Sequence, residues 1–285
     1  GYFNMRNECR SREDYRLYYK KKAVSILLPY VVMTFLLYGY DYHQSGRAFE
    51  LRAYIEETIN QFTALNSEQH LWFMYSLIGL IMSAPFLSKM FHAMSDWEIR
   101  LLFGISIGWN AVSIYLVNDL GWNFYYGKWI MASWTIYFFL GYFQDRIIQK
   151  SDKRFWYLMG AIGFLVTVLW QYVLPVENHS SQDFAPAYVF FVIGLYTMLL
   201  NGVKIPWEPV KTVVRLIAKH SFTVYLIHYL ILELIGNRFY VEYSPKTGFV
   251  MTFLWGFALS MIAAVAFDFL LEKLLQKPLK IVLKI

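Results

Sequence analysis

The residues with the clearest chemical potential lie in one apolar stretch, Arg215 to Gly236, with the sequence RLIAKHSFTVYLIHYLILELIG. The stretch is long enough to span a bilayer, yet it contains Ser221, Tyr225 and His228. Spacings of four and three residues place these side chains on one face of a helix. Because an unpaired polar group in hydrocarbon costs several kcal/mol, this face is predicted to line a bundle interior or a watery cavity. The alternative is a packing role, in which the hydroxyls bond to carbonyls one turn earlier and the histidine stays neutral.

The composition indicates that the whole chain belongs in a membrane. Of its 285 residues, 58% are hydrophobic and only 16% are charged, which is too apolar for one water-soluble globule of this size. The net charge of +6 raises the question of nucleic acid, but the basic residues form short clusters between apolar runs, so no nucleic-acid partner is expected. The single cysteine, Cys9, and the spacing of the histidines give no zinc site, so no metal is expected.

Apolar runs of roughly bilayer length recur along the chain. We therefore predict an all-α fold, a polytopic transmembrane helical bundle of about eight spans in a single domain, 1–285. The longest connection, 41–70, carries Leu51, Ile55, Ile59 and Phe62 at helical spacing, which predicts a short helix lying in the membrane interface. A proline-containing loop is expected at 203–212. The predicted spans are 23–40, 71–90, 99–118, 129–148, 155–174, 184–202, 215–236 and 248–271.

The distribution of Lys and Arg predicts the orientation. If the first span enters from the cytoplasm, all but five of the 26 basic residues fall on the cytoplasmic side, as the positive-inside rule requires. Both termini of the chain are then expected to be cytoplasmic. The basic residues placed outside are Arg47, Arg52, Lys128, Arg238 and Lys246.

This orientation places two histidines in the outer half of the membrane. His228 lies more than half way along a span that runs outward, and His70 stands at the outer end of the span 71–90. Imidazole titrates near neutral pH and can accept a proton from a hydroxyl nucleophile, as transfer of a group onto a sugar or glycerol hydroxyl requires. The alternative for His70 is an anchor at the membrane boundary beside Trp72.

Four segments resemble, in order, the recurrent segments of the acyltransferase-3 family. This resemblance covers essentially the whole chain. It implies an integral membrane O-acyltransferase that uses cytoplasmic acyl-coenzyme A, usually acetyl-CoA, to modify cell-surface glycans or lipid-linked sugars. The segments are KKKAVSILLPY at 20–30, HLWFMYSLIGLIMSAPFL at 70–87, IYFFLGY at 136–142 and HSFTVYLIH at 220–228.

The chain departs from the family pattern in two places. Family members usually have ten spans, and the first carries an arginine followed eleven residues later by a histidine regarded as catalytic. No such pair occurs here, so the first two spans, and with them the general base, are expected to be absent from this sequence. In the basic motif, Lys22 stands at the place of the family's first arginine and Ser25 at the second. A lysine can neutralise a phosphate but lacks the bidentate geometry of arginine.

The resemblance implies roles for named residues. Lys20, Lys21 and Lys22 would bind the coenzyme A phosphates. The side chains that would line the acyl-transfer route are His228, Tyr225, Ser221 and His70.

We therefore expect an acyltransferase, acting on groups other than amino-acyl groups, in the bacterial inner membrane. Its partners would be acyl-coenzyme A as donor, a glycan or lipid-linked sugar as acceptor, and membrane lipid. Two other functions stay open from the sequence alone. They are a transporter or flippase for a lipid-linked glycan, and a non-catalytic membrane partner in polysaccharide assembly, since both also place polar stripes in a helical bundle.

Overall fold

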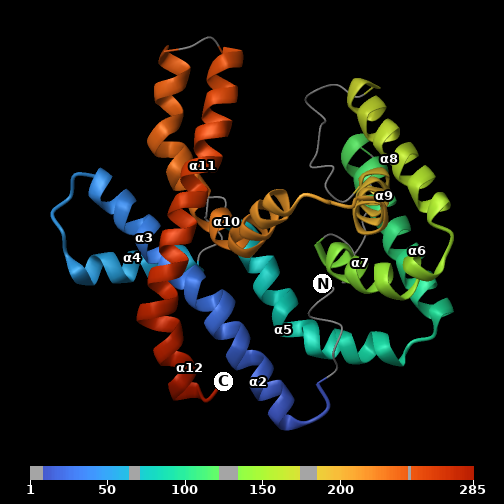
Figure 1. The fold of residues 1–285 in the computed structure, drawn as a ribbon, viewed down its shortest axis with the longest axis horizontal. Coiled ribbons are helices and arrows are strands. Elements are labelled where there is room, and N and C mark those ends of the chain that lie inside the picture. The colour runs from blue at the N-terminus through green and yellow to red at the C-terminus, as the bar shows by residue number, and fades with distance from the viewer. Residues whose placement is uncertain (1–8, 64–70, 122–133, 174–184, 243–244) are drawn as a thin grey trace. The chain divides into compact units, whose positions relative to one another are not determined.

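Every regular element in the described part of the chain is a helix (Figure 1). The computed structural model describes residues 9–63, 71–121, 134–173, 185–242 and 245–285. The chain divides into two compact units, each treated by itself below. The terminal unit comprises residues 11–78 and 205–285, and the central unit comprises residues 79–204 together with the first ten residues. The all-α prediction is confirmed for the described residues, whereas the single domain stays a prediction.

The terminal unit begins with a helix that starts before the first predicted span. Helix α2 (Arg12–Lys22) passes through a π-helical turn (Ala23–Leu27) into α3 (Leu28–Gln44) without a break. A capping box starts it, because Asp14 N donates to Ser11 Oγ at 3.1 Å and Ser11 N donates to Asp14 Oδ2 at 2.8 Å. The basic segment before the first span is therefore helical, although the sequence placed the helix start at 23.

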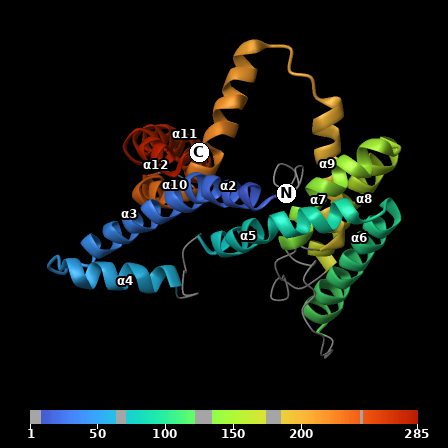
Figure 2. The same ribbon diagram turned by 90° about the horizontal axis from the view of Figure 1, so that it is seen from below.

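Helix α4 (Leu51–Thr63) confirms the helix predicted in the first long connection, and it lies beside α3 (Figure 2). Tyr54 Oη donates to Phe35 O at 2.5 Å, and both guanidinium Nη atoms of Arg47 donate to Glu57 at 3.0 Å. Its side chains Leu51, Ile55 and Ile59 are 60%, 38% and 51% exposed, as an interfacial position requires, and the side chain of Phe62 lies outside the described residues.

Two long helices from the carboxy-terminal half complete the terminal unit. Helices α10 (Glu208–Glu242) and α11 (Pro245–Leu271) pack antiparallel, and α11 continues through a π-helical turn (Glu272–Gln276) into α12 (Lys277–Leu283). The core joins α10 to α3 and to the start of α5 (Trp72–Ala93). Its fully buried members are Tyr30, Met33, Leu37, Leu71, Met74 and Leu226.

The central unit contains the rest of α5 and four further helices. These are α6 (Asp96–Ala111), which runs on into a π-helical segment (Val112–Asp119), α7 (Trp134–Arg146), α8 (Lys153–Val173) and α9 (Pro186–Gly202). Arg146 ties α7 to the α5–α6 turn, since its Nε donates to Asp96 Oδ1 at 2.7 Å and its Nη2 donates to Met94 O at 2.6 Å.

Glycines bring α8 and α9 together. A Cβ atom added to Gly160 would lie 2.7 Å from the Cα atom of Gly194, and one added to Gly163 would lie 2.3 Å from Ala187 O. Small residues permit such close backbone approach in membrane helices, where dispersion contacts drive association.

The structure supports a multi-pass membrane protein without confirming eight spans. Five described helices are long and apolar enough to cross a membrane: Arg12–Gln44, Trp72–Ala93, Asp96–Val117, Lys153–Val173 and Lys246–Leu283. Helix α9 is apolar but has 17 residues, and α7 has 13. Helix α10 is longer than its predicted span because it begins at Glu208, so Pro209 occupies the first helical turn, where its missing N–H is tolerated. The predicted loop thus shortens to 203–207.

The glycine crossing generates a prediction about stability. Gly160→Ala should lower the free energy of unfolding by about 1–3 kcal/mol, because its methyl group would overlap the backbone of α9. Gly104→Ala in α6 is the matched control, since a Cβ there meets nothing within 4 Å and alanine favours helix. Thermal unfolding in one detergent would compare the two. Equal midpoints for both variants would contradict the packing described.

Candidate active site

The imidazole of His228 is held by its own helix. Its Nδ1 lies 2.7 Å from Tyr225 O, a distance at which a protonated Nδ1 donates to the carbonyl. That hydrogen bond selects the tautomer in which Nε2 carries the lone pair. His228 is half-buried. The arrangement therefore presents Nε2 as a base in a partly enclosed position.

Tyr225 connects this position to tyrosine side chains of two other helices. Tyr225 and His228 have ring centroids 6.0 Å apart, and Tyr225 also packs edge-on against Phe73 of α5 at 6.0 Å. Tyr30 of α3 is 1% exposed, and its side chain interacts with those of Tyr75 and Tyr225. The terminal unit thus gathers phenolic hydroxyls beside an oriented imidazole. We call Tyr30, Tyr75, Tyr225 and His228 the tyrosine–histidine cluster.

Ser221 and His70, the other two residues predicted to line the acyl-transfer route, are not part of this cluster. Ser221 shares the helix face but is exposed, and its Oγ donates to Ala218 O at 3.0 Å, so its hydroxyl bonds within its own helix. His70 lies outside the described residues, so its convergence with His228 stays a prediction. The start of α5 does meet α10, because Leu71 and Leu226 share the buried core.

The three lysines of the basic segment lie in the last turn of α2 and point in different directions. Lys20 Nζ donates to Leu283 O at 2.7 Å, and Lys22 Nζ lies 5.6 Å from the ring centroid of Tyr18. Lys21 is exposed. Lys20 thus connects α2 to the carboxy-terminal helix. Of the three lysines, Lys21 is the most accessible to an anion.

A second imidazole on α10 was missed by the sequence analysis. His220 is 5% exposed, and its Nδ1 lies 2.5 Å from Asp268 Oδ2 on α11. Thr223 Oγ1 donates to the other carboxylate oxygen at 2.6 Å. The carboxylate fixes the ring and satisfies two buried polar groups at once. A usable signal was present, since Asp268 is the one charged residue within the predicted span 248–271.

These arrangements are suited to proton transfer. An imidazole whose Nδ1 donates to a carbonyl can act as an acid or a base through Nε2. Within the described ranges, no group of three His, Cys, Asp or Glu side chains lies close enough to hold a metal ion.

The buried His220–Asp268 pair generates a prediction about stability. Asp268→Ala should lower the free energy of unfolding by about 1–3 kcal/mol, because His220 and Thr223 would lose their buried partner. Glu272→Gln is the matched control one turn later, where the ion pair with Lys277 spans 3.4 Å and is exposed. Thermal unfolding would measure both. If Glu272→Gln lowered the unfolding midpoint as much as Asp268→Ala does, the buried pair would contribute no more to stability than an exposed ion pair.

Comparison with known proteins identifies the family of the chain. The family model described as an acyltransferase domain, that of the acyltransferase-3 family, matches residues 1–269. No curated protein and no solved structure matches the chain. Since the match covers nearly all of the sequence, the chain belongs to the acyltransferase-3 family and is a membrane acyltransferase.

Proposed function

We propose that this acyltransferase moves an acyl group, acetyl in the simplest case, from acyl-coenzyme A to a hydroxyl of an extracytoplasmic glycan or lipid-linked sugar. Family membership supports the reaction type and favours an enzyme over the transporter and the non-catalytic partner that the sequence left open. The observation that carries the site is the hydrogen bond between His228 Nδ1 and Tyr225 O, because it orients Nε2 toward proton acceptance.

The resemblance implied a different histidine as the general base; we assign proton transfer during acyl transfer to His228 of the tyrosine–histidine cluster instead. The acceptor hydroxyl gives its proton to His228 Nε2 while its oxygen attacks the thioester carbonyl carbon. The carbon–sulfur bond then breaks, the ester forms, and the coenzyme A thiolate takes up a proton. The phenolic hydroxyl of Tyr225, whose ring lies beside that of His228, would hydrogen-bond the acceptor sugar or the developing oxyanion.

The donor is assigned to the opposite end of the same unit. His220 contacts Asp268 of α11, and Lys20 Nζ donates to Leu283 O at the end of α12, so the lysines of α2 lie beyond the His220 end of α10. Under the proposed orientation, that end faces the cytoplasm of a bacterial cell and both termini lie there. Coenzyme A phosphates would then meet Lys21 and Lys22, and the acyl end would extend toward His228.

The first functional prediction concerns His228. His228→Ala should lower acyl transfer at least about 100-fold, since general acid–base groups contribute factors of this size or more. Expression should stay near that of the wild type, because the apolar packing of α10 is retained. The assay follows transfer of labelled acetyl groups from acetyl-CoA to cell-envelope glycan in membrane vesicles containing the protein.

His92→Ala provides the matched control for that assay. His92 is also a helical histidine whose Nδ1 lies 2.8 Å from a carbonyl of its own helix, that of Ser88, but it is exposed and packs against Tyr142. It should retain transfer activity. Full activity of His228→Ala, or an equal loss in both variants, would remove His228 from the active site.

The second functional prediction concerns the donor. Replacing Lys21 and Lys22 with Gln should weaken binding of coenzyme A and flatten its dependence on salt, because fewer charges then attract the phosphates. Arg12→Gln with Arg16→Gln, on the same helix, is the control and should leave binding unchanged. Binding can be measured by titration of detergent-solubilised protein at two ionic strengths. If the affinity for coenzyme A were unchanged in the Lys variant, these lysines would only set the orientation of the chain in the membrane.

A further inference from the structure

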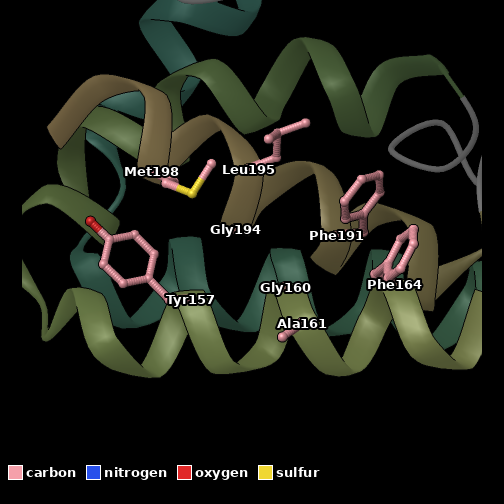
Figure 3. A pocket seen from close by; sticks show the side chains of 8 residues that line it. All are labelled: Tyr157, Gly160, Ala161, Phe164, Phe191, Gly194, Leu195 and Met198. Atoms are coloured by element: carbon pink, nitrogen blue, oxygen red, sulfur yellow. The ribbon is translucent and has the colours of Figure 1, made fainter. Parts of the chain in front are cut away.

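An apolar groove lies between α8 and α9 in the central unit (Figure 3). It has a volume of about 420 Å³. It lies at the glycine crossing, because Gly160 and Gly194 line it and have no side chains to fill it. The residues that line it are Tyr157, Gly160, Ala161, Phe164, Phe191, Gly194, Leu195 and Met198.

The two ends of the groove differ in chemistry. Phe164 and Phe191 lie at one end, with ring centroids 5.3 Å apart. Tyr157 and Met198 lie at the other end, where the Tyr157 hydroxyl points away from the phenylalanines (Figure 3). The groove thus has a wholly apolar end and an end with a polar atom, the pattern that an amphipathic chain requires.

The groove opens onto a surface that belongs in hydrocarbon. Leu195 and Met198 are 40% and 45% exposed, and α8 is among the helices apolar and long enough to cross a membrane. Its outer surface is covered by exposed apolar side chains such as Leu158 and Leu165, 59% and 57% exposed. A groove open on this surface meets lipid chains, since water is excluded from the hydrocarbon core.

Helical spacing places basic residues beyond the polar end of the groove. Arg154, Tyr157, Ala161 and Phe164 follow at intervals of three, four and three residues, so Arg154 continues the stripe of α8 that lines the groove. Lys153 precedes it, and on the antiparallel α9 Lys204 follows the helix end at Gly202.

One acidic side chain lies among these basic residues. Asp152 accepts from Arg154 N at 2.9 Å, so its carboxylate caps the start of α8. Three cationic side chains, Lys153, Arg154 and Lys204, still outnumber it. The polar end of the groove therefore carries a net positive charge, which complements a phosphate group.

We propose that this groove is a binding site for an anionic phospholipid. One acyl chain lies between α8 and α9 against Ala161, with its end toward Phe164 and Phe191. The headgroup phosphate meets Lys153, Arg154 and Lys204. Electrostatic attraction thus selects the lipid class, and the shape of the groove immobilises the chain.

The test measures retained lipid by native mass spectrometry of the purified full chain, reconstituted with phosphatidylglycerol or phosphatidylcholine. Wild type should retain phosphatidylglycerol in preference to phosphatidylcholine. Lys153→Gln with Arg154→Gln should lower that preference roughly 25-fold, since each basic residue near an anionic headgroup contributes a factor of about five.

Filling the groove tests the acyl-chain position separately. Ala161→Phe should abolish retention of both lipids, whereas Val166→Phe, on the same helix but turned about 140° away, should retain them as wild type does. Leu195→Trp fills the groove from α9 and replaces Ala161→Phe if that variant fails to fold.

Three results would overturn the proposal. The first is that wild type retains the two lipids equally. The second is that the groove-filling variants retain as much lipid as Val166→Phe does. The third is that wild type forms a dimer and that the groove-filling variants dissociate it. The last would make the groove an interface between two copies of the chain.

Discussion

The structure depends on the cost of leaving a polar group unpaired in hydrocarbon. Helices satisfy the backbone internally, and several hydroxyl side chains then bond to a carbonyl one turn earlier in their own helix. Thr34 donates to Tyr30 O at 2.9 Å, Ser106 to Leu102 O at 2.9 Å and Thr167 to Gly163 O at 2.8 Å. Other polar groups find a partner on another helix, and these contacts mark positions where two helices are fixed against each other.

Helix α10 carries both kinds of polar group. Nδ1 of His228 lies 2.7 Å from a carbonyl of its own helix, whereas Nδ1 of His220 is paired with a carboxylate of α11. Eight residues separate the two rings, so they lie about 12 Å apart along the helix axis. The pair at His220 fixes α10 against α11, and the core around Leu226 fixes it against α3 and α5. An imidazole held this way needs little reorganisation to accept a proton, which is the condition for electrostatic preorganisation.

Much of the fold could be predicted from the sequence because hydropathy and helix length are local properties. Each predicted apolar run coincides with a described helix at least in part, and the amphipathic α4 was found from its spacing. The capping box at Ser11 is also local and could have moved the first helix start to Arg12. The span count could not be secured, because residues 129–133 of one predicted span lie outside the described residues, α9 has 17 residues and α10 begins with charged residues.

The site was only partly predictable, because its partners come from distant parts of the chain. Tyr225 and His228 follow from helical spacing, but their neighbours Tyr30 and Tyr75 depend on which helices pack together. The His220–Asp268 contact joins residues 48 positions apart, so no periodicity reveals it. Ser221 lies on the face that the spacing predicted, and its hydroxyl bonds within the helix, as the alternative packing role expects.

The measurement that tests the account most directly is a cryo-electron microscopy map of the protein with a non-hydrolysable thioether analogue of acetyl-coenzyme A. The account predicts the acyl end of the analogue beside the tyrosine–histidine cluster, within hydrogen-bond reach of His228 Nε2 through the acceptor hydroxyl or one water. An acyl end bound elsewhere, with His228 turned toward lipid, would contradict it.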